Sequence, residues 1–333
     1  HGVTPFDIKT GVSQKPKIKN VMTYTNIFTK WINHSAQDNK DFIAITPAMR
    51  EGSGLVEFEE NYPNRFFDVG IAEQHSVTLA AGLSVGGLKP IVAIYSTFLQ
   101  RAYDQLIHDV NLQRLNVMFA IDRAGLVGAD GETHHGIYDI SFMRILPNII
   151  LMTPSDENEM WKMLNTGLSY NGPSAVRYPR GNTNGNEIIL TDDTIEIGKS
   201  LTIQEGNKIA LLVFGDLIKN VIDVAKQLSL TLVDMRFAKP LDTKKIEELS
   251  QTHQYLITLE DNVITGGAGS SINEYINDNG LKINITNIGI PDRVVSHGSQ
   301  DELYKEIGLD KKSLEIKINE IYNLIAQNKK VVE

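Results

Sequence analysis

Short apolar runs alternate with longer helical stretches between residues 42 and 180, and this alternation predicts a sheet covered by helices. The runs are rich in Val, Ile and Phe and lie at 42–46, 65–70, 90–96, 117–122, 149–153 and 174–178. Nearly continuous apolar runs are typical of parallel strands that are buried on both faces. We therefore expect an α/β unit that binds its ligands beyond the carboxyl ends of its strands.

A polar crossover divides this pattern into two parts. Between Gly181 and Gly206 the chain is rich in Gly, Asn, Thr and Asp, and the periodicity weakens. Apolar runs then resume at 208–216, 230–237, 255–261 and 283–289, and an amphipathic stretch follows at 313–328. The sequence thus predicts the α/β class with two domains, at 20–185 and 186–333, each a mostly parallel sheet flanked by helices. Residues 1–19 resemble an exposed linker that arrives from another domain.

Composition and charge narrow the classes of protein. At 333 residues, of which 41% are hydrophobic, the chain is long enough for two cores. A formal net charge of -9 without a basic run argues against nucleic acid as a partner. The absence of cysteine excludes disulfides, thiolate nucleophiles and cysteine-bound metals. No apolar stretch reaches the roughly 18 to 20 residues of a membrane span, so we expect a compact cytoplasmic protein with no membrane partner.

Two Gly-rich stretches contain candidate sites. Residues 265–271 follow a predicted strand and open a helix, but they match neither common phosphate-loop pattern, so their glycines indicate a tight turn more readily than an anion site. In the second stretch, His134 and His135 lie near Asp130. Adjacent residues of an extended loop point in opposite directions, so no metal site is expected there. A polar loop just beyond the strand at 117–122 is nevertheless a place where α/β sheets expose functional groups.

Charged residues at predicted strand ends are the other candidates. Glu73 stands at or near the start of a helix rich in Ala and Gly, where a carboxylate is either a catalytic group or an ordinary helix cap. Four arginines lie at or just beyond strand ends, namely Arg50, Arg101, Arg123 and Arg180. Guanidinium groups at this edge suit a phosphate or carboxylate ligand, although single arginines there more often form surface ion pairs.

Longer strings resemble one enzyme family. Segments 45–58, 67–83, 89–110, 122–139 and 173–182, with shorter ones such as 287–292, resemble the 1-deoxy-D-xylulose-5-phosphate synthases, which are transketolase-like thiamine diphosphate enzymes. The resemblance covers essentially the whole chain. It implies a transferase that condenses pyruvate with D-glyceraldehyde 3-phosphate, releasing carbon dioxide and forming 1-deoxy-D-xylulose 5-phosphate. This product is the non-mevalonate precursor of isoprenoids and a precursor of thiamine and pyridoxal.

The resemblance also assigns roles around the cofactor. Glu73 matches the catalytic glutamate that hydrogen-bonds the aminopyrimidine ring of thiamine diphosphate. Phe98 matches the aromatic residue that stacks on this ring, where a plain core phenylalanine is the alternative. Arg101 is assigned to the same cofactor site.

A further group of residues is implied for the acceptor, D-glyceraldehyde 3-phosphate. Arg123 and Arg180 match phosphate-binding arginines, and Tyr95 lies near them in the motif. Asp130 and His134 match catalytic residues that contact the hydroxyl and carbonyl of the acceptor.

One departure from the family is large. The diphosphate and Mg²⁺ ligands of the family are built on a G-D-G motif in an N-terminal domain, and no G-D-G occurs here. We therefore expect no metal ligands in this chain, which alone should bind the cofactor poorly and be inactive. His1 matches a catalytic histidine that follows the absent domain. The family also implies a homodimer.

Two other functions remain open at this point. One is a β-type subunit of a split thiamine diphosphate 2-oxoacid dehydrogenase, which has a similar length and the same two domains. The other is a non-catalytic module that keeps the fold, since fold does not determine function. The joint presence of the candidate cofactor and acceptor residues argues against the module.

Overall fold

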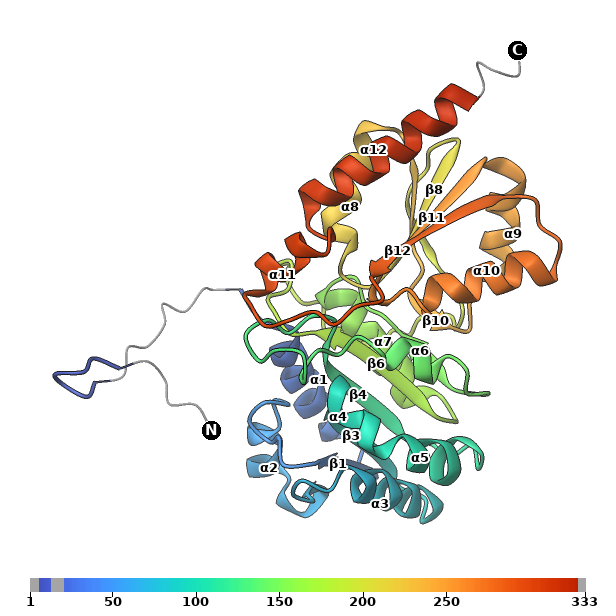
Figure 1. Ribbon diagram of the computed structural model, residues 1–333. Helices are drawn as coiled ribbons and strands as arrows, with labels where there is room; N and C mark the ends of the chain where they lie inside the picture. The colour runs from blue at the N-terminus through green and yellow to red at the C-terminus, as the bar shows by residue number, and fades with distance from the viewer. Residues whose placement is uncertain (1–5, 13–20, 329–333) are drawn as a thin grey trace.

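The computed structural model describes residues 6–12 and 21–328, and residues 21–328 fold around two β-sheets (Figure 1). The first part of the chain begins with a capped helix, in which Thr23 and Asn26 form a reciprocal capping box. Its elements are α1 (Tyr24–Asp38), β1 (Phe42–Thr46), α2 (Val56–Asn61), η1 (Pro63–Arg65), β2 (Phe66–Asp68), α3 (Glu73–Val85), β3 (Lys89–Tyr95), α4 (Ser96–Leu99), η2 (Gln100–Ala102), α5 (Tyr103–Gln105), η3 (Leu106–Asn111), β4 (Met118–Ala124), α6 (Asp139–Met143), β5 (Ile150–Met152), α7 (Glu157–Ser169) and β6 (Ser174–Pro179).

The second part of the chain repeats the alternation of strands and helices. Its last regular element, α12, is also its longest helix. The elements are β7 (Leu201–Gln204), β8 (Ile209–Phe214), α8 (Ile218–Gln227), β9 (Thr231–Asp234), β10 (Phe237–Lys239), α9 (Thr243–Thr252), β11 (Tyr255–Val263), α10 (Ala268–Asp278), β12 (Asn284–Ile290), α11 (Gln300–Glu306) and α12 (Lys311–Asn328).

Both sheets are dominated by parallel strands. The seven-stranded sheet has the order β10-β5-β6-β4-β3-β1-β2, and the five-stranded sheet has the order β12-β11-β8-β9-β7. Among the strands of the described residues, only the edge strands β10 and β7 pair in the antiparallel sense. We call the larger sheet with α1 to α7 the first unit, and the smaller sheet with α8 to α12 the second unit. This arrangement confirms the predicted fold class.

Each predicted apolar run contains a strand, but one run is divided between the two sheets. Residues 230–237 were expected to form a single strand. The chain instead leaves the smaller sheet after Asp234 and adds β10 to the edge of the larger one. Arg236 adopts a left-handed conformation with φ of 59°, and its backbone N–H donates to Asp234 Oδ1 at 2.9 Å. A left-handed residue turns the chain sharply, so this position redirects the strand.

The core explains how the two units are held together. On one face of the larger sheet, α1, α2 and α7 bury an aromatic cluster that includes Phe28, Trp31 and Phe42. On the other face, buried residues of α3 and α6 form one cluster with residues of β8, α9 and α10 from the second unit. Burying one large apolar side chain contributes about 1.5–3 kcal/mol, so a shared core fixes the position of one unit on the other.

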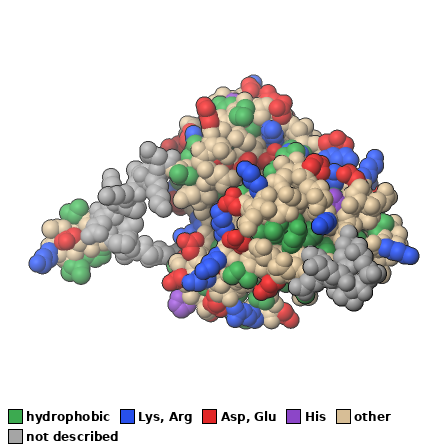
Figure 2. All heavy atoms as spheres, turned by 90° about the horizontal axis from the view of Figure 1, so that it is seen from above, with side chains coloured by type: hydrophobic (Ala, Val, Ile, Leu, Met, Phe, Trp, Pro, Cys, Tyr) green, Lys and Arg blue, Asp and Glu red, His purple; other side chains and the backbone are tan. Residues whose placement is uncertain are grey.

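The surface shows no single dominant sign of charge on the face seen in Figure 2. Lys and Arg side chains are interspersed there with Asp and Glu side chains. Within residues 6–12 and 21–328, none of the helices has the length and apolar character needed to cross a membrane.

Candidate active site

A cavity of about 660 Å³ opens at the carboxyl edge of the larger sheet. Its lining residues end or directly follow β1, β2, β3, β4 and β6, as expected for a parallel sheet. Seven of the nine site residues predicted from the sequence lie together here. The lining consists of Pro47, Ala48, Met49, Ile71, Glu73, Tyr95, Phe98, Arg123, Asp130, His134 and Arg180.

Glu73 is a buried carboxylate at the first position of α3. It is 3% exposed, and its backbone oxygen accepts a hydrogen bond from Ser76 Oγ at 2.6 Å. Arg101, itself half-exposed, forms an ion pair with Oε2 of Glu73. Among the described residues, no hydrogen-bond donor reaches Oε1. Glu73 therefore keeps one oxygen for a ligand, while Arg101 contacts Glu73 and does not line the cavity.

Three aromatic rings form one wall of the cavity. The rings of Tyr95 and Phe98 stack with centroids 5.3 Å apart and planes 9° apart. His134 contacts Phe98 edge-on at 5.6 Å. The Arg123 guanidinium lies over the Tyr95 ring, 4.2 Å from its centroid. This geometry suits a cation–π contact and leaves a flat apolar surface beside Glu73.

Arg123 is held firmly by its own unit. Its Nη1 donates to Asp122 Oδ2 at 2.6 Å and to the backbone oxygen of Gly52 at 2.7 Å. Asp122 also accepts from Thr25 Oγ1 at 2.8 Å, and burial raises the pKa of Asp122 to about 6. Because these bonds use Nη1, the Nε and Nη2 groups of Arg123 remain available for an anion.

Arg180 is held less tightly on the other side of the cavity. It forms an ion pair with Asp130, and both side chains are nearly half exposed. Its Nη1 also donates to the backbone oxygen of Val127 at 3.2 Å. The structure thus brings two of the four candidate arginines, Arg123 and Arg180, into one cavity, whereas Arg50 pairs with Glu51 and does not line it.

The adjacent histidines separate, as predicted. His134 faces the cavity, and its Nδ1 lies 2.9 Å from Thr133 Oγ1. His135 is buried beneath the loop instead. In the described part of the chain, no group of three or more His, Asp or Glu side chains could hold a metal ion. The remaining predicted residue, His1, lies outside the described residues.

Several contributors to the site were missed from the sequence. Asp122 and Thr25 position Arg123 although they lie 97 residues apart in the chain, and only folding brings them together. Ile71 lines the cavity and is 75% exposed, so it forms an apolar rim. The sequence offered one signal for Ile71, which is its position two residues before Glu73. Such i, i+2 spacing does not show whether an apolar residue lies at the rim of a cavity or in the core.

The glycines at 265–271 form a turn that holds a protein carboxylate. Both oxygens of Glu260 accept backbone N–H groups at the start of α10, from Ala268 at 2.8 Å and Gly269 at 2.9 Å. A Cβ on Gly267 would lie 2.3 Å from Glu260 Oε2, so glycine is required. Burial raises the pKa of Glu260 to about 8. The helix start is already occupied by Glu260, which leaves no place for an external anion.

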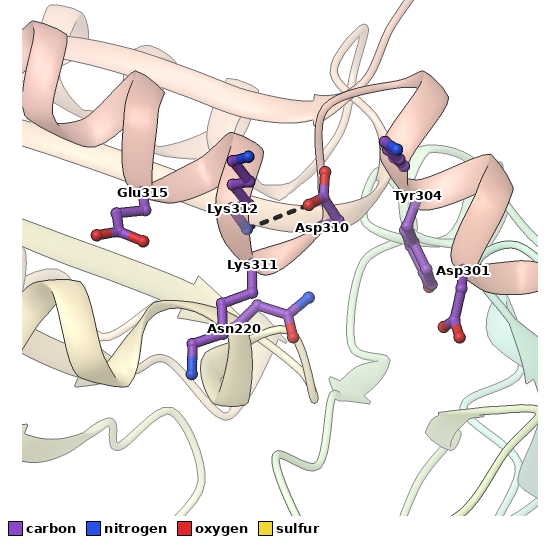
Figure 3. A pocket seen from close by; sticks show the side chains of 8 residues that line it. Asn220, Asp301, Tyr304, Asp310, Lys311, Lys312 and Glu315 are labelled. Carbon is purple, nitrogen blue, oxygen red and sulfur yellow. Dashed lines mark hydrogen bonds between the residues drawn. The ribbon is translucent and has the colours of Figure 1, made fainter.

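A second hollow of about 540 Å³ lies in the second unit, between α8, α11 and α12 (Figure 3). Two of its charged side chains have local partners: Asp310 accepts from the Lys312 backbone N–H at 3.1 Å, and Lys311 pairs with Asp223. Glu315 and Asp301 lie at opposite sides of the view and do not converge on one point. This hollow therefore shows no arrangement of groups that suits a particular ligand.

Two family descriptions match this chain. The family described as "Transketolase, pyrimidine binding domain" matches residues 20–186, and "Transketolase, C-terminal domain" matches residues 198–314. The chain belongs to the transketolase family. Six strands of its seven-stranded sheet lie in the residues that match the pyrimidine-binding domain, and the edge strand β10 and the five-stranded sheet lie in the residues that match the C-terminal domain.

Curated relatives in this family confirm the predicted resemblance. The chain is 55% identical over 318 residues to 1-deoxy-D-xylulose-5-phosphate synthase of Mannheimia succiniciproducens, covering 96% of this chain and 51% of that relative. It is 54% identical to the synthase of Pseudoalteromonas translucida, covering 94% of this chain and 50% of that relative. The chain thus spans about half the length of the curated relatives it matches.

Solved structures agree on the fold. A structure titled as a split gene transketolase, inactive beta4 tetramer, superposes with a TM-score of 0.78 at 24% identity, covering 90% of this chain and 98% of that one. Transketolase from Campylobacter jejuni superposes with a TM-score of 0.75 at 18% identity, covering 92% of this chain and 48% of that one. At these identities the likeness establishes the transketolase-like fold alone.

Proposed function

We propose that this chain is the pyrimidine-binding and C-terminal part of a 1-deoxy-D-xylulose-5-phosphate synthase. The observation that carries the proposal is the composition of one cavity, in which the buried Glu73 carboxylate lies with the Phe98 ring and two arginines. A carboxylate beside an aromatic face suits an aminopyrimidine ring, and two guanidinium groups suit a phosphate. The identity to synthases over nearly the whole chain supports the choice of reaction.

The residues present fit the pyrimidine half of thiamine diphosphate. Oε1 of Glu73 is available to hydrogen-bond the ring, and Phe98, Met49 and Ile71 supply apolar surface around it. When bound, the cofactor supplies the carbon nucleophile that attacks pyruvate. Arg101 holds the other oxygen of Glu73 and so orients the carboxylate. The diphosphate and Mg²⁺ ligands would come from the part of the enzyme that this chain does not match.

The acceptor would lie across the opposite side of the cavity. Arg123 and Arg180 would bind the phosphate of D-glyceraldehyde 3-phosphate, the first as a prepositioned fork and the second after leaving Asp130. His134, in contact with Phe98, and Asp130 would contact the carbonyl and hydroxyl of the acceptor. The apolar rim at Ile71 would exclude water once the cavity is covered.

In the proposed mechanism, this chain alone is not sufficient for catalytic activity. We infer that a diphosphate-binding domain completes the site and that the active enzyme is a homodimer. The structure of similar extent titled as an inactive tetramer of a split transketolase is consistent with an incomplete half. A β-type subunit of a 2-oxoacid dehydrogenase is disfavoured, because the curated relatives at 52–55% identity are synthases.

The test uses the complete enzyme, meaning this chain together with the diphosphate-binding half of a relative such as the Mannheimia succiniciproducens synthase. With thiamine diphosphate, Mg²⁺, pyruvate and D-glyceraldehyde 3-phosphate, we expect formation of 1-deoxy-D-xylulose 5-phosphate. Glu73→Ala should lower kcat by at least about a hundredfold, because a contact to the reacting group is lost. Glu60→Ala, on the exposed side of α2, is the matched control.

Two results would contradict this proposal. Absence of product from the complete wild-type enzyme would reject the reaction. Near-normal turnover by Glu73→Ala would reject the role of the buried carboxylate while leaving the reaction in place.

A further inference from the structure

The loop between β4 and α6 carries two of the cavity residues and rests on the second unit. We call residues 125–136 the acceptor loop, because Asp130 and His134 lie in it, and residues 296–300 the support segment. The support segment follows β12 and ends at the first residue of α11, beside the loops of the first unit (Figure 1). Leu126, near the start of the loop, and Ile137, directly after the loop, are buried in the hydrophobic core of the second unit.

Gln300 links the start of the acceptor loop to the end of β6, which carry residues on two sides of the cavity. Its Nε2 donates to the backbone oxygen of Leu126 at 2.7 Å and to the backbone oxygen of Arg180 at 3.2 Å. An amide nitrogen has two hydrogens, so both bonds form at once. One side chain thereby sets the distance between the start of the acceptor loop and the strand end that carries the Arg180 guanidinium.

His135 adds a second link between the loop and the support segment. Its Nδ1 accepts from the Val127 backbone N–H at 3.2 Å, which places the ring proton on Nε2. Nε2 then donates to the Ser296 backbone oxygen at 3.1 Å. The buried histidine therefore ties the loop to itself and to the support segment.

The close approach of the two segments depends on two loop glycines. Gly128 and Gly131 have φ of 85° and 79°. A Cβ on Gly128 would lie 3.1 Å from the Gln300 backbone nitrogen, and one on Gly131 would lie 3.3 Å from His297 Cβ. The loop is thus packed along the support segment with little space between them.

A buried ion network continues this support at the base of the loop. Arg177, 3% exposed, pairs with Asp139 at 2.8 Å and with Asp261 of the second unit. Its Nη2 also donates to the backbone oxygen of Gly136 at 3.3 Å. Since removing one member of such a network leaves an uncompensated buried charge, these residues are poor choices for a functional test.

We propose that Gln300 is a positioning residue for the acceptor site, through which the second unit holds the acceptor loop at a fixed distance from Arg180. The proposal rests on the proposed function, because the loop and Arg180 are assigned there to the acceptor. Gln300 does not touch the acceptor itself. Its effect should therefore fall on acceptor binding and leave the pyruvate half of the reaction intact.

Kinetics of the Gln300→Ala variant of the complete enzyme test this role. Gln300 is the first residue of α11, where the capping box of Ser299 and Glu302 remains intact, so the helix should still form. We expect the KM for D-glyceraldehyde 3-phosphate to rise about three- to tenfold, as for the loss of one or two hydrogen bonds. The KM for pyruvate, kcat and the midpoint of thermal unfolding should stay near wild-type values.

Two further variants sharpen the result. Gln300→Glu places a carboxylate without donors against two carbonyl oxygens, so the acceptor KM should rise more than in Gln300→Ala. Gln251→Ala, on the exposed surface of α9, is the matched control and should change nothing. An unchanged acceptor KM in Gln300→Ala, or an equal change in both KM values with a lower unfolding midpoint, would overturn the proposal.

Hydrogen exchange of this chain separates the inference from the proposed function. The backbone N–H groups of Val127 and Gly136 are both hydrogen-bonded within the acceptor loop. In Gln300→Ala they should exchange faster than in wild type, while Gln251→Ala leaves them unchanged. Unchanged exchange would refute the support by Gln300 whatever the enzyme does. If exchange rises but the complete wild-type enzyme makes no product, the proposed function fails and the structural support stands.

Discussion

Arg123 and Arg180 face the same cavity but are held in different ways. The Arg123 side chain is 17% exposed and is fastened within its own unit by Asp122, Gly52 and the Tyr95 ring. The Arg180 side chain is 45% exposed and pairs with Asp130, which is 47% exposed. The backbone of Arg180 is held from the second unit by Gln300. One guanidinium is thus fixed before a ligand arrives, and the other is adjustable.

The difference matters for the energy of anion binding. A prepositioned group loses little conformational entropy on binding, so Arg123 should contribute more of the affinity. An exposed ion pair is worth only about 0–1 kcal/mol, and a phosphate can therefore displace Asp130 from Arg180 at small cost. In the proposed function, Arg180 would release Asp130 when the anion binds, which would link phosphate binding to the freeing of this carboxylate.

The largest effect is expected from Arg123. Arg123→Ala should lower kcat/KM for D-glyceraldehyde 3-phosphate by about a hundredfold, since charge-assisted hydrogen bonds to the phosphate are lost. Arg123→Lys should recover only part of this loss, because the planar fork is absent. Steady-state kinetics of the complete enzyme provide the measurement, and Arg50→Ala, outside the cavity, is the matched control. Full recovery by lysine would show that charge alone matters at this position.

A smaller loss is expected from Arg180. Arg180→Ala should raise the KM for the same acceptor by about tenfold, because binding at this arginine must first break its pair with Asp130. The comparison is made with the same assay and the same Arg50→Ala control. If Arg180→Ala were as damaging as Arg123→Ala, the distinction between a fixed and an adjustable arginine would be wrong.

The smallest effect is expected at the contact between Asp234 and Ser155, which joins the two units and which we call the junction. Asp234 of the second unit accepts from Ser155 Oγ of the first at 2.6 Å, and burial raises the pKa of Asp234 to about 7. A carboxyl whose folded pKa is raised stabilises the fold fully below its unfolded pKa, near 4, and this stability is lost as pH rises through 7. In Asp234→Asn the amide oxygen can accept from the Arg236 backbone N–H and the amide nitrogen can donate to Ser155 Oγ, so both contacts remain without this loss. Its unfolding midpoint, relative to wild type, should therefore be higher at pH 8 than at pH 5.

Thermal unfolding at both pH values measures this effect. Asp223→Asn, which alters an exposed carboxylate paired with Lys311, is the control and should show no such gain at pH 8. If the unfolding midpoints of Asp234→Asn and wild type differed by the same amount at both pH values, the Asp234 carboxyl would not titrate between pH 5 and pH 8 in the folded protein.

The pattern of apolar and polar residues predicted much of the fold, because strands and helices form mainly according to residues that are near one another in the chain. The ten apolar runs contain strands because such runs are typical of sheets covered by helices, although the edge strand β2 is largely exposed. The run at 230–237 shows the limit of this reasoning. Its division between two sheets depends on the left-handed conformation of Arg236 and on its hydrogen bond to Asp234. The pattern of hydrophobic residues gives no sign of that hydrogen bond.

Periodicity and residue type over short stretches were enough to predict the two α/β units, the start of a helix at Glu73 and a polar loop after β4. The folded structure was needed to show that Arg123 and Arg180 share a cavity while Arg50 does not line it, and that Arg101 contacts Glu73 from outside the cavity. It alone placed Gln300 behind the acceptor loop, 174 residues from Leu126. The physical reason is that convergence depends on strand order and on the packing of one unit against the other, and these arise from contacts between residues far apart in the chain.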